Sequence, residues 1–100
     1  MLAKHRNYLL QDAKPLHAHV EVIPTGLIAV EILEKHQNHQ SEFDQLHFDR
    51  SGNTTKLVGK EVYRGRPVEW QLPLAEQDAN ELEHLIEEAS EELEILMRDL

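Results

Sequence analysis

The stretch that decides the fold is residues 75–100, AEQDANELEHLIEEASEELEILMRDL, the last quarter of the sequence. Apolar side chains recur in it at alternating spacings of four and three residues, which is the period of a heptad stripe on an amphipathic helix. Pro73 favours an extended residue before it, and Asp78 with Glu81 can form a capping box. The spacing predicts one helix over residues 75–99. Its stripe consists of Ala75, Ala79, Leu82, Ile86, Ala89, Leu93, Leu96 and Leu100.

The stripe has two possible uses, and the sequence leaves both open. It can pack the helix on the rest of the chain, with Leu85 and Met97 widening the apolar face. It can also meet the stripe of a second copy in a homodimer. Each large apolar side chain contributes roughly 1.5–3 kcal/mol when it is buried, so the helix is stable only where its stripe is covered. The positions expected to pack the helix or to form the dimer seam are Leu82, Ile86, Leu93 and Leu96.

The same segment carries the whole charge imbalance of the chain. It has ten acidic residues and one basic residue, a net charge of −9, which equals the net charge of all 100 residues. The acidic face has three interpretations: a solvated surface, the flank of a dimer seam, or a row of carboxylates that docks on a basic protein or mimics nucleic-acid phosphates. The residues expected at such a partner surface are Glu83, Glu87, Glu88, Glu91 and Glu92.

Residues 16–72 predict an antiparallel sheet of about five strands. Apolar and polar residues alternate over 16–23, 43–49 and 67–72, as they do in strands with one buried face. The apolar run over 27–34 follows the turn Pro24-Thr25-Gly26 and predicts the second strand of a hairpin. A helix capped by Thr25 is the alternative for this run.

The remaining segments are less regular. The strand over 54–64 is expected to bulge at Gly59, because Leu57 and Val62 would otherwise face opposite sides. Residues 35–42 are polar and predict a loop, and residues 1–14 predict a short helix or an extended arm. The fold class that follows is α+β: an antiparallel β-meander of about five strands packed against a long acidic C-terminal α-helix.

Length and composition indicate a single globular domain over residues 1–100, with 40% apolar and 29% charged residues. The absence of cysteine excludes disulfides and thiolate chemistry and favours a cytoplasmic protein. No apolar run is long enough for a signal peptide or a membrane span. The negative charge disfavours nucleic acid or an anionic membrane as a direct partner.

Seven histidines are the only candidates for metal binding. His17 and His19 share one face of a predicted strand, and His47 lies on the polar face of another. If the two strands were neighbours, three imidazole nitrogens could converge on a divalent transition metal. The alternative is that all three are solvated residues on the open face of a sheet.

The other chemical candidates are weak. Lys56, Lys60 and Arg64 recur along one strand but lack the interleaved aromatics of a nucleic-acid site, so they are expected to offset the helix glutamates. Trp70 alternates with apolar neighbours and is expected in the core. No nucleophile motif or phosphate-binding loop is present, which argues against an enzyme and against a cofactor.

These observations predict a small acidic interaction or regulatory module that docks its carboxylate-rich helix on a basic protein surface and forms a homodimer. The alternatives are a divalent-metal-binding protein that uses the surface histidines, and a nucleic-acid mimic that inhibits a DNA-binding protein.

Overall fold

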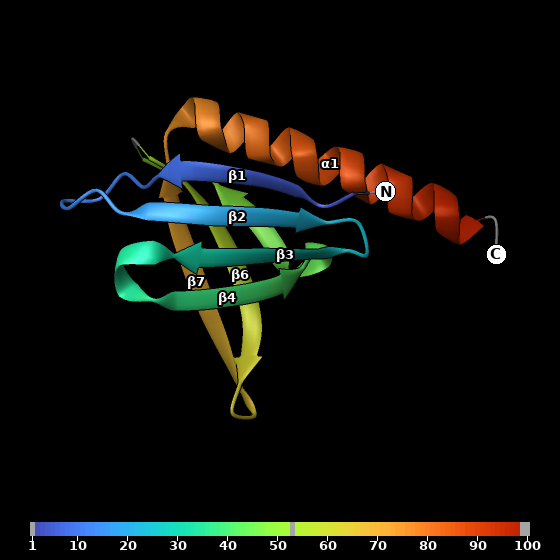
Figure 1. Ribbon diagram of the computed structural model, residues 1–100, viewed down its shortest axis with the longest axis horizontal. Helices are drawn as coiled ribbons and strands as arrows, with labels where there is room; N and C mark the ends of the chain where they lie inside the picture. The colour runs from blue at the N-terminus through green and yellow to red at the C-terminus, as the bar shows by residue number, and fades with distance from the viewer. Residues whose placement is uncertain (1, 53, 99–100) are drawn as a thin grey trace.

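Two antiparallel sheets and one long helix make up the computed structural model, which describes residues 2–52 and 54–98 (Figure 1). The first sheet has the order β1-β2-β3-β4, and the second has the order β5-β6-β7. The α+β prediction of a meander packed with a C-terminal helix is confirmed, but the described residues form seven strands in two sheets. The strands of the first sheet are β1 (Lys4–Leu9), β2 (His17–Ile23), β3 (Leu27–Ile32) and β4 (Gln37–Glu42).

The second sheet runs across the first, so that the two enclose a common core (Figure 1). It consists of β5 (Leu46–Asp49), β6 (Thr55–Tyr63) and β7 (Arg66–Leu74). Short 3-10 turns, η1 (Leu33–Lys35) and η2 (Phe43–Gln45), lie on either side of β4. The core is made by the inward residues of both sheets together with the first turns of the helix. Its largest fully buried side chains are Ile28, Leu57, Leu72, Leu74, Leu82, Val20 and Val22.

Helix α1 (Glu76–Arg98) lies along β1 and extends beyond the strands at its C-terminal end (Figure 1). Ala79, Leu82 and Leu85 are buried, and Ile86 and Ala89 pack at the edge of the core. By contrast, Leu96 keeps 48% of its surface exposed. The predicted stripe is therefore covered by the chain's own sheets over its first half. Leu100 lies outside the described residues.

Two segment predictions are wrong, and one open alternative is decided; all three involve polar side chains. Residues 4–9 form the extended strand β1, the second of the two alternatives for residues 1–14, because this strand pairs along its length with β2. Residues 37–42 form β4 rather than a loop, because they pair with the strand predicted over 27–34. Residues 43–45 form η2, which shortens the predicted third strand to Leu46–Asp49.

The bulge expected at Gly59 is also wrong, because β6 keeps an unbroken register with both β5 and β7. Gly59 faces Trp70 across the strand pair, and a Cβ at this position would lie 2.2 Å from the indole ring. The glycine therefore provides room for Trp70, which is buried as predicted. Val62 consequently points outward and is 74% exposed.

Side chains join the two sheets where β4 approaches β6. The Ser41 hydroxyl donates to the Lys60 carbonyl oxygen at 2.6 Å and accepts the indole N–H of Trp70 at 2.9 Å. The Glu61 carboxylate accepts the Gln40 backbone N–H at 2.9 Å and contacts His39 Nδ1 at 2.7 Å. These contacts satisfy polar groups at a corner where, in the described part of the chain, β4 and β6 belong to separate sheets and share no ladder of backbone hydrogen bonds.

No described helix is long and apolar enough to cross a membrane.

Candidate functional site

Four of the glutamates on α1 are bound by cations of the chain itself. Lys4 of β1 reaches Glu88 at 3.1 Å, and Arg6 of the same strand lies 3.6 Å from Glu81. On the other side of the helix, both terminal nitrogens of Arg50 contact Glu83, at 3.1 and 3.4 Å. Near the end of the helix, Glu94 pairs with Arg98 one turn later. The first three pairs fix the helix against both sheets, and the fourth lies within the helix.

The contact between β1 and Glu81 is partly buried. The Tyr8 hydroxyl donates to Glu81 Oε1 at 2.8 Å, and the Tyr8 ring is buried under the helix. Burial raises the pKa of Tyr8 well above its ordinary value, and the bond to the Glu81 carboxylate adds to the shift. The bond from Lys4 lowers the pKa of Glu88. The raised pKa keeps Tyr8 protonated as a hydrogen-bond donor at neutral pH, and the lowered pKa keeps Glu88 ionised for its pair with Lys4.

The five glutamates predicted to bind a partner therefore divide into two groups. Glu83 and Glu88 are partly buried and occupied by Arg50 and Lys4. Glu87, Glu91 and Glu92 are exposed, and no cation within residues 2–52 and 54–98 pairs with them. We call these three residues the free carboxylates of α1.

The cations that offset the helix are not the ones that the sequence suggested. Lys56, Lys60 and Arg64 make no ion pair with α1 in the part of the chain that the structure describes. Arg64 lies in the β6–β7 turn with a positive φ of 52°, and its guanidinium stacks on Tyr63. Lys4, Arg6 and Arg50 take this role because β1 and the end of β5 lie beside the helix.

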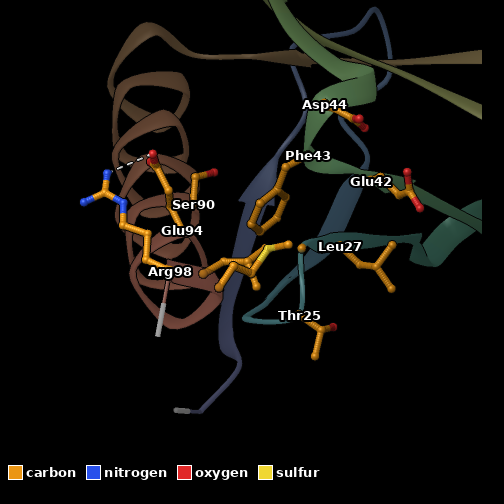
Figure 2. Close-up of a pocket in the computed structure, with 11 residues that line it drawn as sticks. Thr25, Leu27, Glu42, Phe43, Asp44, Ser90, Glu94 and Arg98 are labelled. Carbon is orange, nitrogen blue, oxygen red and sulfur yellow. Dashed lines mark hydrogen bonds and ion pairs between the residues drawn. The ribbon is translucent and has the colours of Figure 1, made fainter. Parts of the chain in front are cut away.

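A groove opens beside the C-terminal half of α1 (Figure 2). One wall is the helix, and the other is formed by the end of β4 together with η2; the turn between β2 and β3 closes its base. Its volume is about 730 Å³, which is in the range of ligand pockets. Leu27, Phe43, Leu93 and Met97 supply the apolar lining. The charged residues at the rim are Glu42, Asp44, Glu94 and Arg98, of which the last two pair with each other. We call this the α1 groove.

Only part of this groove could be predicted from the sequence. Gly26 in the β2–β3 turn and the widening of the apolar stripe by Met97 could be read from the residues. The places of Phe43 and Asp44 in the lining could not be predicted, because η2 comes near the helix only in the tertiary fold. Within the predicted packing set, Leu82 is fully buried and Ile86 is partly buried, Leu93 lines the groove, and Leu96 lies outside it.

The histidines predicted to bind metal do not converge. Nδ1 of His17 is 2.5 Å from the Glu34 carboxylate, and His19 stacks on His5 with 3.2 Å between their nearest nitrogens. His47 belongs to the second sheet, on β5. Among the described residues, no group of three His, Cys, Asp or Glu side chains is arranged to hold a metal ion.

Comparisons of the chain with models of known protein families, with curated protein sequences and with solved structures find no match.

Proposed function

We propose that the chain is a protein-interaction module that docks the free carboxylates of α1 on a basic surface of a partner protein. One observation carries this proposal: Glu87, Glu91 and Glu92 are exposed and lack cation partners in the described chain, whereas Glu81, Glu83, Glu88 and Glu94 each have one. The charge of the helix is thus partly used for folding, and the remainder is available to a partner.

The electrostatics of the helix favour such a partner. Glu87 and Glu91 are one turn apart, and like charges in this position repel each other by roughly 0.2–0.5 kcal/mol. A cation from a partner would relieve this repulsion as well as form a new pair. Charge complementarity of this kind increases the association rate and selects the partner by sign.

The alternatives have less support. A phosphate mimic needs a long row of unpaired charges, and Lys4 and Arg50 neutralise two of the five expected positions. A metal-binding protein needs converging ligands, and His17 and His19 are engaged by Glu34 and by His5 with Asn7. We retain the cytoplasm as the proposed compartment because the chain has no cysteine.

A second copy of the chain is the other partner that we propose. Ile95 and Leu96 are 55% and 48% exposed near the end of α1, where the helix extends past the strands (Figure 1). Covering these side chains with the same surface of another copy would form a two-fold interface. This homodimer would use the end of the predicted stripe rather than its full length.

Docking is tested by fluorescence anisotropy with labelled synthetic peptides. The probes are a Lys/Arg-rich peptide without large apolar residues and a Glu-rich peptide of the same length. The test variant is Glu87→Gln/Glu91→Gln/Glu92→Gln. Its control is Asp12→Asn/Glu31→Gln/Glu69→Gln, which removes the same charge from exposed positions outside the helix.

We expect only the basic peptide to bind, and we expect its affinity to fall as salt rises. Three exposed charge pairs contribute roughly 0.2–1 kcal/mol each, so the affinity of the helix variant for the basic peptide should fall about tenfold. The control variant should lose much less. Equal losses in the two variants would mean that net charge alone attracts the peptide and would overturn the proposal.

A further inference from the structure

We infer that the α1 groove receives one bulky apolar side chain of a basic segment of the partner, flanked in that segment by Lys or Arg. This inference rests on the proposed function and names the partner's chemistry. The groove lies directly beside the free carboxylates: Ser90 and Glu94 line it, and Glu87 is one helical turn before Ser90 on the same side of α1. A segment that contacts the carboxylates can therefore reach the groove.

The groove is part of the folded framework. Gly26 has a φ of +106°, which glycine adopts readily, and a Cβ there would lie 3.1 Å from the Leu93 side chain. This glycine lets the helix approach the β2–β3 turn closely. The Phe43 backbone N–H donates to the Gly26 carbonyl oxygen at 2.9 Å and fixes η2 to the same turn. Helix, turn and η2 are thus held together before any ligand arrives, which lowers the entropic cost of binding.

The centre of the groove is apolar and open. The Phe43 ring extends into the space between the helix and the sheet, and Ser90 and Glu94 of α1 lie on the helix side of this space (Figure 2). Met97 lines the groove and is 65% exposed. Methionine adapts its shape to an incoming apolar group because it is unbranched and polarisable. An apolar side chain seated here would cover Met97 and the exposed part of Phe43.

The rim selects the charge of the occupant. Glu42 and Asp44 stand on one wall and Glu94 on the other, and in Figure 2 the first two point away from the apolar centre. No cation in the described ranges pairs with Glu42 or Asp44, and Arg98 is engaged by Glu94 at 3.1 Å. An apolar side chain between Lys or Arg residues matches this combination, and one between acidic residues does not.

The test compares two short Lys/Arg-rich peptides that differ at one position, a central Phe or a central Ala. Anisotropy gives the affinity of each for the wild-type chain and for four variants. Met97→Gln alters the apolar lining, and its control is Val62→Gln, an exposed apolar residue at the end of β6. Asp44→Asn alters the rim, and its control is Asp12→Asn. Backbone amide shifts of Gly26, Phe43 and Ser90 locate the bound peptide.

We expect the Phe peptide to bind the wild type about tenfold or more tightly than the Ala peptide, which is the effect of burying one large apolar side chain. Met97→Gln should reduce this ratio to about threefold or less, and Asp44→Asn should weaken both peptides. The two controls should keep the wild-type values. Amide shifts should concentrate at Gly26, Phe43 and Ser90.

Several results would overturn the inference. Equal binding of the two peptides would remove the groove as an anchor while leaving the docking of basic peptides by the free carboxylates intact. Failure of both peptides to bind would remove the proposed function as well.

A Phe-to-Ala ratio unchanged by Met97→Gln would place the anchor elsewhere. Unchanged binding to Asp44→Asn would remove the rim's role in selecting charge. A wild-type dimer that Met97→Gln converts to monomer without peptide would assign the groove to a second copy.

Discussion

Gly59 and Trp70 show how one small residue positions a large one. The indole ring occupies the space where a Cβ of residue 59 would be, stacks on His39 with ring centroids 5.7 Å apart, and donates to Ser41. A methyl group at residue 59 would displace the ring and disturb both contacts. Trp70 of β7 can therefore reach β4 because Gly59 of β6 has no side chain in its way.

We expect Gly59→Ala to destabilise the fold by about 1–3 kcal/mol or more, the usual cost of overpacking a core. Urea unfolding followed by far-ultraviolet circular dichroism measures this cost. The same substitution in a Trp70→Leu background is the control, because a smaller side chain leaves room for the methyl group. Equal costs in the two backgrounds would show that backbone conformation, and not the indole ring, requires the glycine.

His17 and Glu34 form the clearest pH-dependent pair. The imidazole and the backbone N–H of His17 both contact the Glu34 carboxylate, and together they lower the pKa of Glu34 to about 2 from an ordinary 4.5, the side-chain contact being the larger cause. A carboxylate whose pKa is lowered by folding stabilises the folded state above its unfolded pKa. This contribution is lost as the pH falls from about 4.5 through about 2.

His17→Ala should raise the pKa of Glu34 part of the way back toward 4.5, because the backbone contact remains. An NMR titration of the Glu34 side-chain carboxyl carbon measures the midpoint. His47→Ala is the matched control and should leave it unchanged. An unchanged midpoint in His17→Ala would mean that the backbone N–H alone holds the carboxylate.

At the scale of elements, the sequence predicted the strands whose alternation depends on apolar residues, left β1 open between a helix and an extended arm, and missed β4, where the one buried side chain is polar. β1 directs Lys4, Arg6 and Tyr8 toward the helix. There Lys4 pairs with Glu88, and Arg6 and Tyr8 both contact Glu81. In the sequence, the face of β1 that packs on the helix therefore looks like the solvent-exposed face of a strand. The partners lie more than 70 residues away along the chain, so no local pattern reveals them.

β4 was missed for a related reason, and the groove with it. Only Ser41 is buried in this strand, and its stability depends on Glu61 and Trp70, which are distant in the sequence. The α1 groove likewise joins three separate segments. The long helix and its acidic face could be predicted, because each follows from spacing and composition within one element. Which of its glutamates stay unpaired depends on Lys4 and Arg50, which lie outside the helix. The wall of the α1 groove formed by η2 and its base formed by the β2–β3 turn could not be predicted, because both depend on the tertiary arrangement.

The two halves of α1 should respond differently to the same substitution. Leu82 is fully buried and Leu96 is 48% exposed on the same helix. We expect Leu82→Ala to cost about 2–5 kcal/mol of unfolding free energy. Leu96→Ala should change it by about 0.5 kcal/mol or less in dilute protein. Urea unfolding at a low and a high protein concentration measures both. Comparable costs at low concentration would mean that the end of the helix packs on its own chain.

At the scale of the whole molecule, the net charge of −9 opposes self-association, and the exposed end of α1 favours it. Salt screens the repulsion but leaves apolar contacts in place. We therefore expect sedimentation equilibrium to give a mass that approaches two chains of 11.6 kDa and rises with salt. Leu96→Glu should keep the chain monomeric, whereas Val62→Glu should not. Docking of basic peptides should weaken in the same salt series. The two proposals require opposite responses to salt, so one salt series tests both. A mass of one chain at every concentration would exclude the homodimer, whereas peptide docking would still be decided by the anisotropy measurement.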